Sequence, residues 1–189
     1  MQPRPKPRQA RLPATTFDGT AWLPTLLCAL LCLPLQPVQA ADEAQALRNI
    51  EQQFRRGETQ AALQSLEQGL QARPGDAGLR LLKAIILSES GRPTDAARLL
   101  EQLTQDFPEL PEPYNNLAVL QAAAGRLQQA RASLESALRL DPLYRTAHEN
   151  LGDVLVRLAL QAYEAAAGKR IDAPLQTKLR LARELTAAR

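Results

Sequence analysis

Cysteine, histidine, methionine and aromatic side chains are scarce in this chain of 189 residues. It has 2 cysteines, Cys28 and Cys32, a single histidine, His148, and 4% aromatic residues. Both cysteines lie between Met1 and Ala40, so a chain without that segment has no thiol for a disulfide bond or a metal site. One histidine without such partners provides neither a metal-ligand set nor a catalytic base near a serine. We therefore expect no catalytic residue, no cofactor and no metal, and predict that the protein is not an enzyme.

An excess of charge of one sign is also missing once residues 1–40 are set aside. This leading segment contains four of the 23 basic and one of the 20 acidic side chains, which leaves 19 of each in the remainder. The formal net charge of +3 therefore belongs to the leading segment. A balanced remainder gives no basic surface of the kind that binds nucleic acids, so nucleic acid is not an expected partner.

The leading segment has the pattern of a secretory signal. Basic residues between Arg4 and Arg11 precede an apolar run over residues 21–35, and a small-residue cleavage pattern follows at Val38-Gln39-Ala40. We expect residues 1–40 to be removed after Ala40, which would leave a periplasmic or secreted protein. The alternative is a retained inner-membrane anchor, although the apolar run is shorter than the roughly 20 residues that span a bilayer.

The rest of the chain repeats at a constant interval, since Gly57, Gly91 and Gly125 are evenly spaced. Four kinds of slot recur: a glycine, an alanine, a leucine and a proline. They are Gly57, Ala62, Leu66 and Pro74, then Gly91, Ala96, Leu100 and Pro108, then Gly125, Ala130, Leu134 and Pro142. A period of roughly 20 to 50 residues with fixed small and large slots is typical of stacked repeats. Because alanine, leucine, glutamine, glutamate and arginine dominate, each repeat is expected to be helical, and the fold class is all-α.

The third interval carries the clearest resemblance to a known family. Tyr114-Asn115-Asn116-Leu117-Ala118 is followed by Gly125-Arg126 and by the alanines and leucines up to Leu140-Asp141-Pro142. This pattern resembles a tetratricopeptide repeat. The resemblance implies a right-handed superhelix of stacked antiparallel helix pairs, with repeats at residues 41–76, 77–110 and 111–144.

The C-terminal part departs from this pattern. Residues 145–171 begin like a fourth repeat, but Ala159 stands where the turn glycine is expected, so residues 145–168 form either one helix or two. Residues 172–189 carry an apolar stripe of Leu175, Leu179, Ala182 and Leu185, with a polar opposite face. A helix of this kind is expected to cap the last repeat.

The family resemblance implies that the first helix of each repeat lines a concave surface where a partner binds. The residues transferred to that surface are apolar or mainly acidic: Leu47, Glu51, Phe54, Leu81, Ile85, Glu112, Asn115, Val119, Glu149 and Asp153. Family members that grip a terminal carboxylate have lysine and asparagine at particular slots. The lysine slots here hold Leu47, Leu81, Asn115 and Glu149, so that clamp is absent. An acidic rim instead favours a neutral or basic partner segment with apolar anchors.

These patterns predict a non-catalytic scaffold or adaptor in the bacterial periplasm that binds another protein or peptide. A membrane-anchored assembly or chaperone factor for a secretion or pilus system is the alternative. The apolar stripe could also pack against the chain's own final helix or a second copy, so a homo-oligomer stays open.

Overall fold

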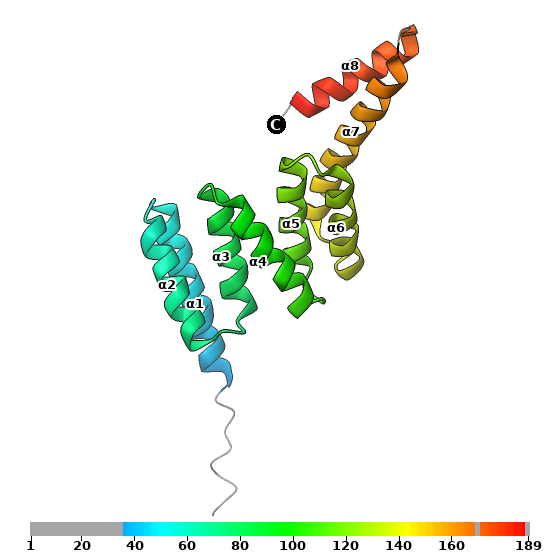
Figure 1. The fold of residues 1–189 in the computed structure, drawn as a ribbon. Coiled ribbons are helices and arrows are strands. Elements are labelled where there is room, and N and C mark those ends of the chain that lie inside the picture. Colours follow the sequence, from blue (N-terminus) through cyan, green and yellow to red (C-terminus); the bar gives the residue numbers. More distant parts are fainter. Residues whose placement is uncertain (1–35, 169–170, 188–189) are drawn as a thin grey trace, which may run out of the picture. The chain divides into compact units, whose positions relative to one another are not determined.

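The computed structural model describes residues 36–168 and 171–187, with side chains from residue 44 onward. These residues form eight helices and no strand, in an unbroken succession along the chain (Figure 1). The helices are α1 Gln36–Arg55, α2 Thr59–Ala72, α3 Ala77–Glu89, α4 Pro93–Asp106, α5 Pro111–Ala123, α6 Leu127–Leu140, α7 Arg145–Ala167 and α8 Ala173–Ala187. The prediction of an all-α fold of stacked helix pairs is confirmed.

The same turn joins the two helices of each of the first three pairs. Gly57, Gly91 and Gly125 have φ of 81°, 76° and 74°, which is the left-handed region that glycine adopts at little cost. The residue after each glycine donates its backbone N–H to the carbonyl five residues earlier, over 2.8 to 3.0 Å. These bonds satisfy carbonyls that the end of the first helix leaves open. The glycine slot of the repeat is therefore a helix C-terminal turn.

Alanine occupies the positions where paired helices cross. Ala62, Ala96 and Ala130 are 0% exposed, and the leucine four residues after each of them is at most 1% exposed. A methyl side chain lets two backbones approach closely, while the leucines fill the wider space beside the crossing. The small and large slots of the repeat thus form the core.

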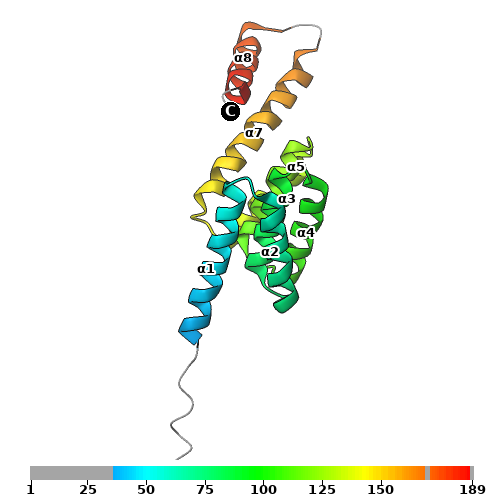
Figure 2. The same ribbon diagram turned by 90° about the vertical axis from the view of Figure 1, so that its left-hand side faces the viewer.

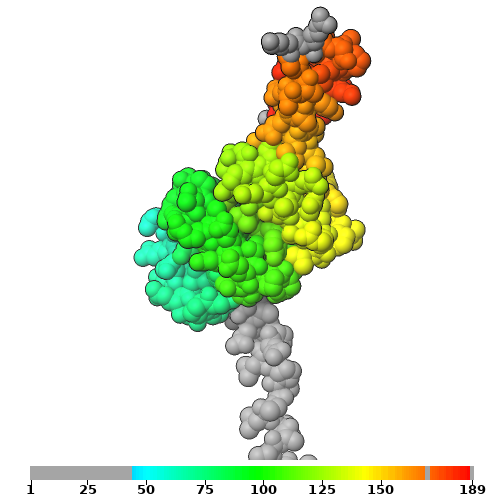
Figure 3. Space-filling view, turned by 45° about the vertical axis from the view of Figure 1, so that its right-hand side comes forward, coloured from blue at the N-terminus to red at the C-terminus, as the bar shows by residue number. Residues whose placement is uncertain are grey.

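Helix α7 is longer than the other described helices and has no turn within it. It spans 23 residues, against 14 in α6, so it is about 35 Å long where α6 is about 21 Å. Ala159 stands at the position of the missing turn glycine and stays helical, because alanine has no preference for positive φ. Residues 145–167 are therefore one helix. Its C-terminal half extends beyond the α5–α6 pair (Figure 3).

Helix α8 runs back alongside α7. Asp172 precedes it, and the Asp172 Oδ1 atom accepts the backbone N–H of Leu175 over 2.9 Å, as a helix N-cap does. Of helices α2 to α7, only α7 packs against α8 (Figure 2). Among the described residues of the predicted capping segment 172–189, Ala173–Ala187 form one helix.

The predicted signal segment falls mostly on residues outside the described part of the chain. Helix α1 begins at Gln36 and so includes the last five residues of that segment. Within the described residues, no helix is long and apolar enough to span a membrane. Removal of residues 1–40, membrane anchoring and the repeat boundaries remain predictions.

Candidate functional site

A pocket lies between α3 and α5, the first helices of the second and third repeats. Its volume is about 170 Å³. We call it the α3–α5 pocket, and its lining residues are Ala84, Ile85, Ser88, Glu89, Leu100, Asn116, Val119 and Leu120. Two residues predicted for the partner surface, Ile85 and Val119, meet in it. They occupy the same slot in successive repeats, which is why stacking brings them together.

The floor of the pocket is apolar and partly open to solvent. Val119 is 46% exposed, and Ile85 is half-buried. The neighbouring Ala84 and Leu100 are at most 1% exposed and belong to the core that joins α3, α4 and α5. The pocket therefore sits on a rigid base, while its rim keeps apolar surface in contact with water.

Polar groups stand beside this apolar floor. The Asn116 side-chain amide donates to the backbone carbonyl of Glu112 over 2.9 Å, while its side-chain oxygen makes no hydrogen bond within the described residues. Ser88 and the exposed Glu89 lie on the α3 side. The pocket thus offers an acceptor, a hydroxyl and a carboxylate to a bound polypeptide.

The charged residues among those predicted for the partner surface are all carboxylates. Glu51, Glu89 and Glu112 are exposed and take part in no ion pair within the described residues. Glu149 differs, because Arg145 Nε lies 3.0 Å from its carboxylate. The carboxylates of Glu51, Glu89 and Glu112 are therefore available to a cationic side chain of another molecule.

Glu112 also acts on a tyrosine at the start of α7. Burial raises the pKa of Tyr144 above its ordinary value, and the negative charges of Glu112 and Asp141 raise it further. The phenol therefore stays neutral over the physiological range.

Three apolar residues predicted for the partner surface in the first two repeats have a different role. Leu47 and Phe54 are half-buried and pack against the core that joins α1, α2 and α3. A β-carbon built at Gly78 would stand 3.4 Å from a Leu47 methyl, so Leu47 lies against the start of α3. Leu81 packs against the core around α3 and α4. These three leave only part of their surface for a partner.

Asn115 does not face a partner. It is 4% exposed, and its Oδ1 atom accepts a hydrogen bond from Asn150 Nδ2 of α7 over 2.9 Å. The prediction that Asn115 presents its side chain on the binding surface therefore needs correction: the amide joins α5 to α7. The polar residue that α5 contributes to the pocket is Asn116, one position and about 100° further around the helix.

Asp153 lies apart from the α3–α5 pocket. It is half-buried and lines a cavity of about 20 Å³ together with Val156, Arg157 and two residues of α8, Leu185 and Thr186. Arg157 Nη1 also donates to the backbone carbonyl of Ala122 over 2.9 Å. The structure thus gathers Ile85 and Val119 at one pocket and places Asp153 at another.

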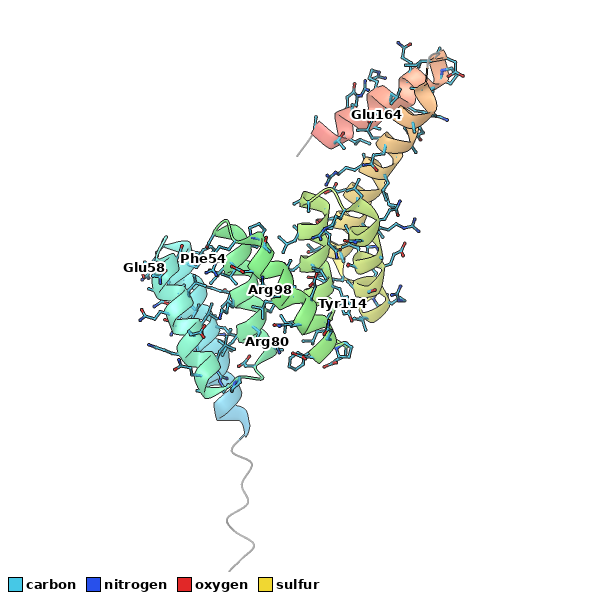
Figure 4. The ribbon with its side chains drawn as sticks, viewed as in Figure 1. Phe54, Glu58, Arg80, Arg98, Tyr114 and Glu164 are labelled. Atoms are coloured by element: carbon cyan, nitrogen blue, oxygen red, sulfur yellow. The ribbon has the colours of Figure 1, made fainter. Side chains whose placement is uncertain are left out.

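Larger hollows lie elsewhere. One of about 430 Å³ lies between α2 and α3, one of about 530 Å³ lies between α4 and the end of α5, and one of about 630 Å³ lies beside α7 and α8. An ion pair between Arg183 Nη2 and Glu164, 3.2 Å apart, lies at the hollow beside α7 and α8, near the Glu164 label in Figure 4. None of these three hollows is lined by a residue predicted for the partner surface. We base the site on the smaller pocket because its walls continue the first-helix face.

The single histidine is part of the repeat framework. His148 is exposed, and its Nε2 atom lies 3.0 Å from the backbone carbonyl of Pro142. Tyr114, labelled in Figure 4, occupies the same slot one repeat earlier, and its hydroxyl lies 3.5 Å from the carbonyl of Pro108. Both side chains therefore contact the proline turn that precedes their own helix. Within the described residues, no group of three His, Cys, Asp or Glu side chains is placed to hold a metal ion.

Comparison with solved structures finds the same fold in several proteins. The second tetratricopeptide repeat domain of human RPAP3, in complex with the HSP70 peptide SGPTIEEVD, is 17% identical to this chain. The match has a TM-score of 0.52 and covers 58% of this chain and 91% of the RPAP3 domain. The Sgt2 domain from Aspergillus fumigatus is 17% identical, with a TM-score of 0.59 over 70% and 86%. An O-GlcNAc transferase variant from Thermobaculum terrenum is 26% identical, with a TM-score of 0.55, but the match spans 65% of this chain and 26% of the transferase.

A comparison with curated proteins gives no significant match to the chain. A comparison with family models, in contrast, agrees with the structural match. The family model described as tetratricopeptide repeat matches residues 53–119 and again residues 87–151, which together are more than half of the chain. The chain therefore belongs to the tetratricopeptide repeat family.

Proposed function

We propose that the chain is a non-catalytic scaffold that binds a segment of another protein across α3 and α5. The observation that carries this proposal is the α3–α5 pocket, a hollow with an apolar floor on a rigid base, lined by the Glu89 carboxylate, which has no ion-pair partner within the described residues. Its volume of about 170 Å³ is below the roughly 300 Å³ of a typical small-molecule site, and it suits one aliphatic side chain. One anchor of this kind, with polar contacts around it, is how a peptide is held.

The charges define the partner segment further. Glu89 and Glu112 favour a basic residue beside the apolar anchor, since opposite charges raise the association rate and like charges oppose binding. The HSP70 peptide in the RPAP3 complex ends in the acidic sequence EEVD. Such a tail would meet carboxylates here, and Leu47, Leu81 and Asn115 occupy slots where a carboxylate-binding member has lysine. We infer a neutral or basic segment.

The proposed location is the periplasm, after removal of residues 1–40. The support is the sequence pattern of the leading segment, from its basic start to Val38-Gln39-Ala40. A membrane-anchored assembly or chaperone factor is the competing function, and it differs in retaining the apolar run. The intact mass of the protein recovered from the cell envelope decides between them, because cleavage after Ala40 removes the mass of the whole leading segment.

Site-specific photocrosslinking tests the binding site. A photoreactive phenylalanine at position 119 lies on the rim of the pocket, whereas the same group at position 102 lies on the exposed side of α4. We expect position 119 to give a defined adduct with one protein in cells. The adduct should disappear when Glu89→Lys and Glu112→Lys are introduced together, because the reversed charges repel a basic segment.

Glu101→Lys is the matched control for that experiment. Glu101 is exposed on α4, has no ion pair within the described residues and does not line the α3–α5 pocket. The adduct should persist in this variant, and helicity by circular dichroism should be unchanged in all of them. An adduct that survives the double reversal, or equal adducts from positions 102 and 119, would refute the proposed site.

A further inference from the structure

Helix α8 covers the part of α7 that corresponds to the open α3–α5 pocket. The correspondence follows from the repeat: residues 153, 156 and 157 lie two repeat intervals after residues 85, 88 and 89. Ile85, Ser88 and Glu89 form the α3 wall of the α3–α5 pocket. Asp153, Val156 and Arg157 form the α7 wall of the cavity that α8 closes.

The two hollows differ in what forms their second wall. At α3 the second wall is α5, and about 170 Å³ remains between the two helices. At α7 the second wall is Leu185 and Thr186 of α8, and about 20 Å³ remains. Such a volume admits little more than one water molecule. The chain therefore fills the fourth-repeat part of its own binding face.

The contacts that hold α8 on α7 are limited. Leu179 and Ala182 are 4% and 6% exposed, whereas Leu181 and Leu185 are 47% and 61% exposed. Two exposed contacts accompany this small core: the ion pair between Arg183 and Glu164 at 3.2 Å, and the Lys178 ammonium 5.9 Å from the Tyr163 ring. Contacts of this kind at the surface contribute little stability. Helix α8 is thus held by few buried groups.

The chemistry of α8 matches the partner proposed for the α3–α5 pocket. Leu181 and Leu185 are four residues apart, on one side of the helix. Lys178, Arg180 and Arg183 make the helix basic. An apolar pair beside basic residues is what the α3–α5 pocket favours, because its lining combines an apolar floor with the Glu89 carboxylate.

We propose that α8 is an intramolecular ligand of the binding face, and that a basic amphipathic helix from a partner has to displace it to extend onto α7. This inference rests on the proposed function, because it assumes that the first-helix face is the binding face. A tethered segment competes at an effective concentration on the order of millimolar. The apparent affinity for an outside helix is therefore the intrinsic affinity multiplied by the fraction of molecules in which α8 is released.

A labelled peptide tests the displacement in the full chain. The probe is a fluorescein-labelled synthetic peptide with the sequence of residues 171–189, and binding is measured by fluorescence anisotropy. The release variant combines Leu179→Asp with Ala182→Asp, which removes the buried contacts of α8 and leaves the α7 surface intact. We expect this variant to bind the peptide about tenfold or more tightly than the native chain does. Ala187→Asp, at an exposed position of α8 outside the Leu181 and Leu185 pair, should bind as the native chain does.

Two substitutions in the release variant locate the bound peptide. Val156→Asp should weaken peptide binding at least about tenfold, because a carboxylate would then stand in the cavity that Val156 lines together with Leu185. Gln102→Asp places the same group on the exposed side of α4, away from both hollows, and should have no such effect. Equal affinities of the native chain and the release variant, no binding by the release variant, or an equal loss caused by Gln102→Asp would each overturn the proposal.

Hydrogen exchange of the native chain is the second measurement. It is needed if the two aspartates of the release variant unfold more of the chain than α8 alone. Amides of α8 should exchange at least about tenfold faster than those of residues 145–157, because a displaceable helix opens on its own. Equal protection of the two segments would overturn the proposal. The peptide and exchange measurements report on α7 and α8, while the photocrosslinking experiment reports on α3 and α5, so either proposal can fail alone.

Discussion

At the scale of single residues, the repeat turns depend on glycine for one reason. Gly125 has φ of 74° and nothing within 4 Å of the position that a β-carbon would take. Backbone strain therefore decides the effect of Gly125→Ala, and we expect it to lower the free energy of unfolding by about 1–2 kcal/mol. Urea unfolding followed by circular dichroism measures this loss.

Gly152 provides the matched control. It is exposed inside α7, also with nothing within 4 Å, but its backbone is helical. Gly152→Ala should raise the free energy of unfolding by about 0.5–1 kcal/mol, since alanine restricts the unfolded chain and favours the helix. The same sign for both substitutions would show that φ is not the deciding difference.

Tyr144 makes stability depend on alkaline pH. Burial, then Glu112 and Asp141, raise the pKa of this phenol in the folded state. Below the pKa of Tyr144 in the unfolded chain, which is near 10, the phenol is protonated in both states and its contribution to the free energy of unfolding is fully present. That contribution is lost as the pH rises through the folded pKa, because the unfolded chain releases its proton first. Between about pH 9 and 11, the native chain should therefore lose stability more steeply than Tyr144→Phe.

Glu112→Gln separates the causes of that shift. It removes one negative charge near Tyr144 but keeps the burial, which is the larger cause of the raised pKa, so the alkaline slope should fall only in part. Urea midpoints at each pH measure the slope. Identical slopes for the native chain and Tyr144→Phe would contradict the assignment.

Asn115 and Asn116 mark the limit of prediction for single residues. The sequence places both on the first helix of the third repeat, and family slots put Asn115 on the binding face. Packing of α7 against α5 instead buries Asn115 at 4% exposure and leaves Asn116 beside the pocket. A rotation of about 100° separates the two outcomes, and the contact that fixes it joins residues 35 positions apart.

At the scale of helices, N-caps distinguish α3 from α2. The Asp76 side chain accepts the backbone N–H of Leu79 over 3.0 Å, whereas Glu58 at the start of α2 makes no such bond. Asp76→Ala should therefore lower the free energy of unfolding by about 1 kcal/mol, and Glu58→Ala should change it by less than about 0.5 kcal/mol. Thermal and urea unfolding of both variants provide the comparison. Equal losses would mean that the cap contributes nothing.

Helix α7 shows how the replacement of one turn glycine by alanine lengthens a helix. Gly57, Gly91 and Gly125 end the first helix of their repeats, but Ala159 continues the helix through the corresponding slot. The sequence indicated that the turn was absent and left one helix or two open. The structure has one, because alanine favours helix and the outer half of α7 packs against α8.

At the scale of the whole molecule, stacking makes stability uneven along the chain. Among helices α2 to α8, α5 and α6 form the most extensively packed pair, and α5 also contacts α3, α4 and α7. Repeat proteins open from their ends, since each repeat contacts only its neighbours. Amides of α5 and α6 should therefore exchange last in hydrogen-exchange mass spectrometry, and those of α2 earlier. Uniform protection across the stack would indicate a single cooperative unit instead.

The stacked arrangement also limits where a partner can lie. Open apolar surface remains at the α3–α5 pocket, while α8 fills the corresponding place on α7. In the proposed binding mode, the length of a bound segment and its affinity therefore depend on whether α8 stays in place. This coupling belongs to the assembled chain, since it needs α3, α5, α7 and α8 together.

The amino-acid sequence by itself determined the helices, their pairing and the repeat turns, because these depend on local propensity, on glycine at positive φ and on alanine at crossings. The fold family follows from the same repeat pattern. Only the tertiary structure decided which side chains of each first helix face solvent, that residues 145–167 form one helix, and that α8 packs against α7. The physical reason is that these outcomes depend on contacts between helices far apart in the sequence, whose rotation and spacing no local pattern encodes.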